Sequence, residues 1–261
     1  MTPTVHEPLQ LAVSMPPGPR TLVLDFDGTL APIVDIPDDA RLVDGADAVL
    51  RQLGGQVPIM VLSGRDLDDI APRLDGLPVD VAGNHGARLA TADGEHIELV
   101  DIAASAATLA QLAERLDELL GDDPGWFVEA KPTSVAVHHR LVAEDEVELL
   151  LPRVEALLAE AARQYPGFDV LHGKAVVEFR VSTVDKGAAV DWFVARHPNR
   201  PPIALGDDIT DEDAFAAAIR HGGCAILVGR ATHETHATTR LADPRAVIDF
   251  LALLADAQAK V

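Results

Sequence analysis

Residues 21–30 read Thr-Leu-Val-Leu-Asp-Phe-Asp-Gly-Thr-Leu, and this stretch decides the fold class. The apolar run from Leu22 to Leu24 is unbroken, which is typical of a strand that is buried on both faces of a sheet. Two carboxylates and a glycine follow at the point where such a strand ends. Because strands of this kind occur in parallel sheets that helices cover, the stretch predicts an α/β protein.

Three further apolar runs have the same form, at residues 58–62, 202–205 and 224–228. Helical patterns lie between or after the runs, at residues 45–53, 67–74, 186–196, 211–219 and 244–254. Strands that alternate with helices indicate a Rossmann-like core, in which a parallel sheet carries helices on both faces.

The middle of the chain has a different pattern. Leucines at helical spacing predict an amphipathic helix over residues 104–120. A second helical pattern covers residues 143–165, and Pro152 must kink this helix or mark a fresh start. Strand-like segments accompany the two helices, at residues 126–131, 134–140, 168–171 and 175–181. The order helix-strand-strand-helix-strand-strand predicts a small α+β module inserted into the parallel-sheet core.

The inserted module divides the chain. We expect residues 1–103 and 182–261 to form the core, and residues 104–181 to form the module. Residues 1–20 carry no basic segment and no long apolar run, so we expect them to be a flexible leader and not a signal peptide.

The chain is strongly acidic, with 21 basic and 42 acidic side chains among 261 residues and a formal net charge of −21. Nucleic acid backbones and anionic lipid surfaces repel such a charge, so we expect neither a nucleic acid nor a membrane as partner. A hydrophobic fraction of 48% excludes an acidic disordered tail. Cys224 is the only cysteine, which fits a reducing compartment. We therefore expect a cytoplasmic globular protein, and we expect it to be a monomer.

Polar side chains stand at the ends of three predicted strands: Asp25 and Asp27, then Ser63, then Asp207 and Asp208. In an open α/β sheet, ligands bind outside the carboxyl ends of the strands, so these residues should converge. Crowded carboxylates repel each other, which raises their pKa values. Bound Mg²⁺ relieves this repulsion, because it prefers oxygen ligands from carboxylates, carbonyl groups and water.

Lys186 begins the predicted helix that follows the inserted module, and it can add a fixed positive charge to the same place. A carboxylate nucleophile, a metal, a lysine and a second carboxylate for proton transfer together suggest phosphoryl transfer. Ordinary roles remain open for some of these residues. Ser63 and Asp211 are suited to capping the helices that follow them, and Lys186 can be a surface lysine.

These motifs resemble, in order, the four motifs of the haloacid dehalogenase-like hydrolases. The resemblance implies that Asp25 attacks phosphorus and forms an aspartyl-phosphate. Asp27 would protonate the leaving oxygen and then deprotonate the hydrolytic water. Ser63 would bind a phosphoryl oxygen, and Lys186 would neutralise the phosphate and position Asp25.

The same resemblance implies a Mg²⁺ site. The Asp25 carboxylate, the main-chain carbonyl of Asp27 and Asp207 would hold the ion, with Asp208 and Asp211 in support.

The inserted module carries two patterns of polar residues: Glu129, Lys131, Ser134, His138 and Arg140, and then Gly173-Lys174-Ala-Val-Val-Glu178. The module occupies the position of a substrate-selecting cap in this superfamily, and the two patterns resemble those of the trehalose-6-phosphate phosphatases. The resemblance implies a set of substrate-binding residues. They are Glu129, Lys131, His138, Arg140, Lys174 and Glu178 in the module, with Arg65, Asn84 and His85 in the core.

The strand pattern of the module supports part of this set. Residues two apart on a strand share a face, so Glu129 and Lys131 share one, as do His138 and Arg140. A sheet face with these groups can hydrogen-bond a sugar, but an antiparallel sheet also has an ordinary solvated face. Gly-Asn-His-Gly, which contains Asn84 and His85, is also a good turn sequence.

The resemblance therefore implies a Mg²⁺-dependent phosphatase that hydrolyses trehalose 6-phosphate through an aspartyl-phosphate. A related phosphatase acting on sucrose-phosphate or on mannosyl- or glucosyl-phosphoglycerate is the alternative within the enzyme class. A phospho-acceptor signalling domain is the alternative from another class. Such a signalling domain is shorter than this chain and has no inserted module. Its acidic pair also precedes the strand of the acceptor aspartate, whereas Asp25 and Asp27 stand together here, so these differences argue against that interpretation.

Overall fold

The computed structural model of the chain describes residues 3–15, 18–34, 36–121, 123–131, 133–173, 175–230 and 233–258. Contacts divide the chain into two compact units, Met1–Leu99 with Asp185–Val261, and Val100–Val184. This division falls a few residues away from the boundaries that the sequence predicts. The assignment of the smaller unit as a substrate-selecting cap remains a prediction.

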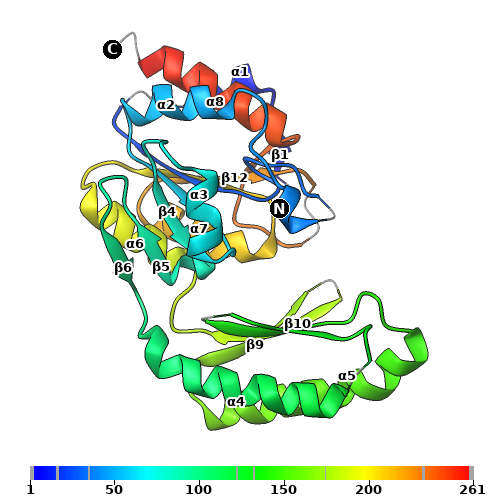
Figure 1. Cartoon of the computed structure of the whole chain (residues 1–261). Coiled ribbons are helices and arrows are strands. Elements are labelled where there is room, and N and C mark those ends of the chain that lie inside the picture. Colours follow the sequence, from blue (N-terminus) through cyan, green and yellow to red (C-terminus); the bar gives the residue numbers. More distant parts are fainter. Residues whose placement is uncertain are drawn as a thin grey trace. The chain divides into compact units, whose positions relative to one another are not determined.

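The larger unit is built on one nine-stranded sheet (Figure 1). Its strands, in spatial order, are β1 (Thr4–Val5), β13 (Thr239–Leu241), β12 (Cys224–Val228), β11 (Pro202–Gly206), β2 (Thr21–Asp25), β3 (Ile59–Leu62), β4 (Asp80–Gly83), β5 (Arg88–Ala90) and β6 (His96–Glu98). All neighbours from β1 to β4 are parallel, whereas β5 and β6 add an antiparallel edge.

Helices cover both faces of this sheet. They are α1 (Pro8–Ser14), α2 (Ala46–Gly54), α3 (Leu67–Arg73), α6 (Lys186–Arg196), α7 (Glu212–Arg220) and α8 (Pro244–Gln258). The fully buried strand β2 shows how the two layers form. Leu22 and Leu24 pack into a cluster with α1, α2, α3 and α8, whereas Val23 packs on the opposite face with α6 and α7. The predicted α/β fold class is confirmed.

The order of the strands reverses beside β2. From β2 the chain proceeds through β3 to β4 on one side, and later through β11 to β12 and β13 on the other. The carboxyl ends of β2 and β11 therefore flank a topological switch point, which is where open α/β sheets bind their ligands.

The smaller unit has the predicted order of elements. They are α4 (Ile102–Leu120), β7 (Phe127–Ala130), β8 (Ser134–His138), α5 (Glu144–Gln164), β9 (Phe168–Gly173) and β10 (Val176–Val181). The strands form an antiparallel sheet in the order β7-β8-β10-β9. One face packs on the two helices: Val135 and Phe179 are fully buried in a cluster with Leu116 and Leu158.

Several sequence expectations need correction. The expected leader is ordered where it is described, because β1 pairs with β13 and Leu11 of α1 is buried beneath α8. Helix α5 continues through Pro152, so Pro152 does not mark a fresh start, and the alternative expectation of a kink there stays a prediction. Strand β8 ends at His138, so Arg140 lies in a turn and does not share the strand face. No helix in the described part of the chain is long and apolar enough to cross a membrane.

Candidate active site at the sheet switch point

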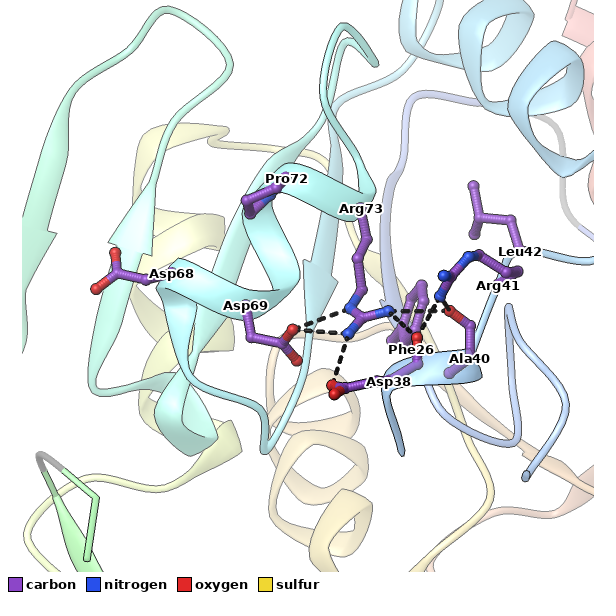
Figure 2. A pocket seen from close by; sticks show the side chains of 9 residues that line it. All are labelled: Phe26, Asp38, Ala40, Arg41, Leu42, Asp68, Asp69, Pro72 and Arg73. Carbon is purple, nitrogen blue, oxygen red and sulfur yellow. Dashed lines mark hydrogen bonds and ion pairs between the residues drawn. The ribbon is translucent and has the colours of Figure 1, made fainter. Parts of the chain in front are cut away.

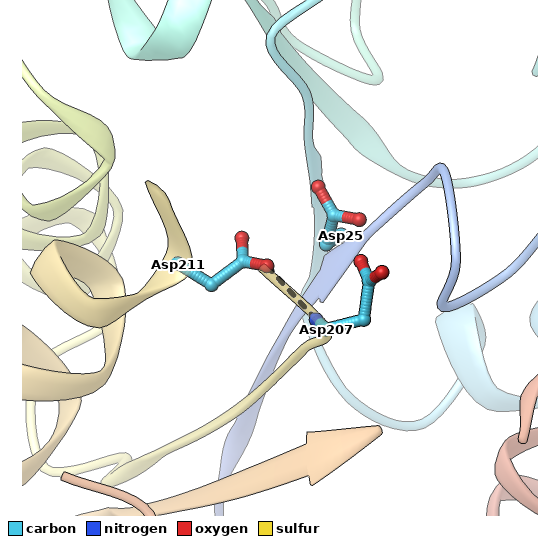
Figure 3. A group of neighbouring side chains, drawn as sticks. All are labelled: Asp25, Asp207 and Asp211. Carbon is cyan, nitrogen blue, oxygen red and sulfur yellow. Dashed lines mark hydrogen bonds between the residues drawn. The ribbon is translucent and has the colours of Figure 1, made fainter. Parts of the chain in front are cut away.

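Three carboxylates meet at the switch point (Figure 3). Asp25 is the last residue of β2, Asp207 follows β11, and Asp211 ends the short 3-10 helix η3 (Ile209–Asp211). One oxygen from each lies within 4.8 Å of the others. Asp25 and Asp211 are buried, while Asp207 is partly exposed. Chain segments far apart in sequence thus bring three like charges into one small volume.

Lys186 neutralises two of these charges. Its Nζ lies 2.6 Å from Asp25 Oδ1 and 2.6 Å from Asp211 Oδ1, and its side chain is almost entirely buried. Lys186 is the first residue of α6, and the Asp185 side chain caps that helix by accepting a hydrogen bond from the backbone N–H of Ala188. The start of α6 is therefore fixed, and the ammonium group is directed at the carboxylates.

Asp211 is a scaffold residue as well as a charge. Its Oδ2 accepts hydrogen bonds from the backbone N–H groups of Asp207 and Asp208, at 2.9 and 3.0 Å. Its other oxygen accepts from Lys186. Asp208 is exposed, and its carboxylate accepts from the backbone N–H of Ile209 at the start of η3. The acidic run after β11 thus builds its own turn, and Asp207 remains to face Asp25.

Two glycines make this crowding possible. Gly28 has a φ of +83°, and a Cβ atom there would overlap the carboxylate of Asp207. A Cβ atom at Gly206 would overlap the carboxylate of Asp211. Both glycines stand in the motifs that the sequence singles out, but their steric role becomes visible only when the two loops face each other.

The electrostatics follow from this crowding. Burial raises the pKa of Asp25 well above its ordinary value, the charge of Asp211 raises it further, and Lys186 opposes the rise. Burial, with the charges of Asp211 and Asp208, raises the pKa of Asp207 to about 7. Burial alone lowers the pKa of Lys186, but Asp211 and Asp25 outweigh it, so its pKa is raised and the ammonium stays charged. The carboxylates are thus able to hold a divalent metal ion, because its charge relieves their remaining repulsion.

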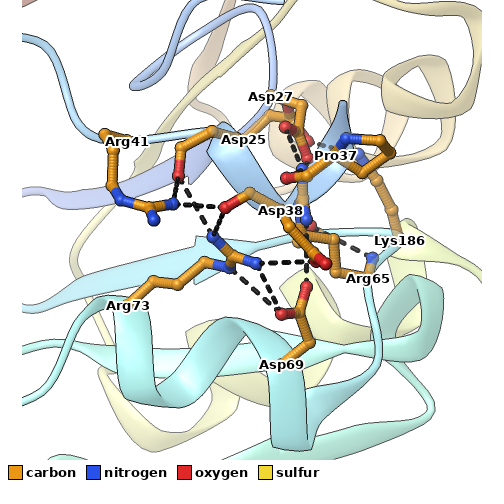
Figure 4. Close-up of polar contacts among 11 residues, drawn as sticks. Asp25, Asp27, Pro37, Asp38, Arg41, Arg65, Asp69, Arg73 and Lys186 are labelled. Carbon is orange, nitrogen blue, oxygen red and sulfur yellow. Dashed lines mark hydrogen bonds and ion pairs between the residues drawn. The ribbon is translucent and has the colours of Figure 1, made fainter. Parts of the chain in front are cut away.

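The loop after β3 contributes Ser63 and Arg65. Ser63 is buried, and its Oγ accepts a hydrogen bond from the backbone N–H of Arg65 at 3.2 Å. It does not cap α3, because Asp66 is the N-cap and accepts from the backbone N–H of Asp68. Arg65 binds both carboxylate oxygens of Asp27 (Figure 4). The structure therefore brings Arg65 to the proton-transfer residue that the sequence predicts.

Asn84 and His85 form a tight turn after β4, with φ values of +52° and +54°. The Asn84 amide group is used within the core: Oδ1 accepts from the backbone N–H of Leu67, and Nδ2 donates to Asp66. A Cβ atom at Gly64 would lie 2.6 Å from the His85 ring, so that glycine leaves room for the ring. The turn interpretation of this motif is therefore correct, while any contact with substrate remains a prediction.

In the smaller unit, several polar side chains gather on the sheet face away from the helices. Glu129 Oε2 lies 3.2 Å from Lys131 Nζ and 3.0 Å from His138 Nε2. Hydrogen bonding to His138 is the main cause that lowers the pKa of Glu129. Glu178 shares this face, because Ala136 lies between Glu129 and Glu178 in the strand register. Lys174, the remaining predicted contact of this unit, lies outside the described residues.

Comparison with known proteins shows the family of the chain. The sequence model of the trehalose-phosphatase family matches residues 23–245. The chain belongs to this family. It is 42% identical over 245 residues to a trehalose-phosphate phosphatase of Mycolicibacterium paratuberculosis, and the match covers 89% of this chain and 61% of that protein.

A further sequence relative and a solved structure are also similar to the chain. An uncharacterized glycosyl hydrolase of Mycobacterium tuberculosis is 43% identical over 243 residues, which cover 89% of this chain and 18% of that protein. The C-terminal domain of a trehalose-6-phosphate phosphatase from C. albicans superposes with a TM-score of 0.79 at 26% identity, covering 98% of both chains. The chain thus spans less than two thirds of these two curated relatives, but nearly all of the solved phosphatase domain.

Proposed function

We propose that the chain is a Mg²⁺-dependent phosphatase that hydrolyses trehalose 6-phosphate to trehalose and phosphate. The contact between Lys186 and Asp25 carries this proposal. A buried ammonium group beside a carboxylate can neutralise a phosphoryl group while that carboxylate attacks it. Membership in the trehalose-phosphatase family supports the choice of sugar.

Asp25 attacks phosphorus and forms an aspartyl-phosphate, while Lys186 neutralises the phosphoryl oxygens. Ser63, which begins the loop after the neighbouring strand β3, binds one of these oxygens. Asp27 gives a proton to the departing sugar oxygen and then takes one from the water that hydrolyses the intermediate. The phosphoryl group passes to water, and Asp25 is regenerated as a free carboxylate.

The residues around Asp25 also fit a divalent ion. Asp25, Asp207 and the main-chain carbonyl of Asp27 hold it, and donors that are all oxygens favour Mg²⁺. When bound, the ion supplies positive charge that stabilises the transferring phosphoryl group. Asp211 and Asp208 support the site through the turn after β11, because their carboxylates already accept backbone hydrogen bonds.

We assign selection of the sugar to the smaller unit. Glu129, Lys131, His138 and Glu178 supply donors and acceptors on one sheet face, and such groups suit a polyhydroxylated sugar. The other predicted substrate contacts are Arg140 and Lys174 in this unit, and Asn84 and His85 in the core. We further propose that the protein acts as a monomer in the cytoplasm. Its net charge of −21 favours a small sugar phosphate over nucleic acid as ligand.

Phosphate release from a panel of sugar phosphates tests this function. The panel contains trehalose 6-phosphate, sucrose-phosphate, and mannosyl- and glucosyl-phosphoglycerate, each assayed with Mg²⁺ and with a chelator. We expect a strong preference for trehalose 6-phosphate that chelation abolishes and Mg²⁺ restores. Equal or better turnover of another sugar phosphate would contradict the proposal that trehalose 6-phosphate is the substrate. Full activity in the presence of the chelator would contradict the proposed dependence on Mg²⁺.

A further inference from the structure

Arg65 holds the Asp27 carboxylate by two parallel hydrogen bonds. Its Nε lies 2.6 Å from Asp27 Oδ2, and its Nη2 lies 2.8 Å from Asp27 Oδ1. A guanidinium group that binds both oxygens of a carboxylate fixes the plane of that carboxylate as well as its position. The Arg65 side chain is only 12% exposed, whereas the Asp27 side chain is 32% exposed. Asp27 is therefore held from its protein side and keeps an open side.

Arg65 is itself held in place. Its Nη1 donates to Asp69 at 3.0 Å, its Nη2 donates to the carbonyl of Pro37 at 2.9 Å, and its guanidinium lies 5.7 Å from the centre of the Phe26 ring. These three contacts hold the guanidinium group in one orientation. In this orientation it forms its two hydrogen bonds with the Asp27 carboxylate (Figure 4).

In helix α3, Arg73 in turn holds Asp69 in place. Arg73 binds Asp69 through Nε at 3.1 Å and Nη2 at 2.7 Å, and its Nη1 donates to the carbonyl of Ala40 at 3.1 Å. Asp69 and Arg73 lie one turn apart on one side of α3, and Arg65, which precedes the N-cap Asp66, reaches Asp69 from before the start of the helix. Figure 2 shows Asp69 and Arg73 together in the wall of a pocket of about 420 Å³.

We propose that Arg65, braced by Asp69, is a positioning residue that holds Asp27 in the orientation required for proton transfer to the leaving sugar oxygen. This proposal rests on the phosphatase function and goes beyond it, because it assigns Arg65 to Asp27 rather than to the substrate. The role is geometric. A proton donor must lie within hydrogen-bond reach of the leaving oxygen, and small displacements lower the rate sharply.

The test compares two leaving groups. A sugar alkoxide needs a proton as it departs, whereas p-nitrophenolate is stable without one. Single-turnover release of trehalose and of p-nitrophenol, with enzyme in excess, isolates the step that forms the aspartyl-phosphate. For Arg65→Ala and Arg65→Lys we expect trehalose release to slow by about 10- to 100-fold. Release of p-nitrophenol should slow by about threefold or less. Lysine keeps the positive charge but cannot bind both oxygens of Asp27, so Arg65→Lys should not restore the rate of trehalose release.

Asp69→Asn tests the brace, and Asp68→Asn is its matched control. Asp68 is the neighbouring helix residue, and it pairs with Arg88 at 3.0 Å on an exposed surface. We expect Asp69→Asn to slow trehalose release selectively, although less than the Arg65 variants, and Asp68→Asn to leave both rates unchanged. Thermal unfolding of each variant confirms that it is folded.

Two results overturn the proposal. One is a proportional loss of both rates in folded Arg65 variants. The other is a rise in the concentration needed for saturation without loss of the maximal rate, which would assign Arg65 to substrate binding. If the wild-type protein hydrolyses another alkyl phosphate in place of trehalose 6-phosphate, the proposed substrate fails. The comparison of leaving groups then proceeds with that alkyl phosphate and still decides the role of Arg65.

Discussion

The ammonium group of Lys186 lies 2.6 Å from Asp25, which stands 161 residues away in sequence. Lys186 begins a helix on one face of the sheet, and Asp25 ends a central strand. The same ammonium group lies 2.6 Å from Asp211. One buried lysine therefore joins Asp25, the proposed nucleophile, to the turn that carries the other carboxylates, and its removal should affect both stability and catalysis.

Replacing Lys186 by Met should destabilise the protein by about 3–5 kcal/mol, because two buried carboxylates lose their partner. The variant should also lose phosphatase activity. Urea unfolding at neutral pH measures the first effect, and phosphate release measures the second. Stability equal to that of the wild-type protein would contradict the buried ion pair.

Gly28→Ala should disturb the proposed metal site through Asp207. The new methyl group would overlap that carboxylate, and the residue would keep a φ of +83°. Gly45→Ala is a matched control, since Gly45 has a φ of +84° and nothing lies within 4 Å of its missing Cβ atom. We expect both variants to lose about 1 kcal/mol from backbone strain. Only Gly28→Ala should also need more Mg²⁺ for half-maximal activity. An equal Mg²⁺ requirement in the two variants would contradict the packing of Gly28 on Asp207.

Asp207→Asn should make the metal-free protein more stable at neutral pH. Because the pKa of Asp207 is raised to about 7, the folded chain binds more protons than the unfolded chain between about pH 4 and 7. The free energy of unfolding of the wild-type protein therefore falls as the pH rises through this window. Asparagine carries no charge, so the advantage of the variant should be absent below about pH 4 and complete above about pH 7.

Thermal unfolding with a chelator, measured from pH 4 to pH 8, checks this prediction. Asp243→Asn serves as the control, because Asp243 is exposed and accepts a hydrogen bond from the backbone N–H of Ala246, a role that asparagine fills equally well. A constant stability difference between Asp207→Asn and the wild-type protein across this range would contradict the raised pKa.

Glu129→Gln should weaken recognition of the sugar. Glu129 holds both Lys131 and His138, and glutamine loses the charge that orders them. We expect KM for trehalose 6-phosphate to rise about tenfold, while turnover of p-nitrophenyl phosphate stays the same. Glu155→Gln is a matched control from another Glu–His pair, with His172 at 3.4 Å. Equal KM values for all three proteins would remove Glu129 from the proposed sugar site.

The elements that position the site were predictable because their signals are local. An unbroken apolar run followed by Asp25 and Asp27 predicts a buried strand from the sequence alone. It also predicts that the carboxyl end of this strand lies at a ligand site. The edge strands β5 and β6 lack such a signal, since each has only three residues. The N-terminal residues become ordered through pairing and packing with β13 and α8, near the other end of the chain.

The site residues show the same division. Lys186 was predictable from its place at a helix start within an ordered set of motifs. The hydrogen bonds by which Arg65 holds Asp27 were not predictable, although Arg65, Asp69 and Arg73 stand at intervals of four residues in the sequence. Spacing alone predicts a solvated row of ion pairs on a helix. Only the fold shows that this row ends at Asp27.

The central claim is that Asp25 forms a covalent phosphoryl intermediate. Rapid acid quench of the wild-type protein during turnover of trehalose 6-phosphate, followed by peptide mass spectrometry, tests it directly. We predict a phosphoryl adduct on the peptide that contains Asp25, with no adduct and no turnover in Asp25→Asn. Turnover by folded Asp25→Asn, or an adduct on another residue, would contradict the account.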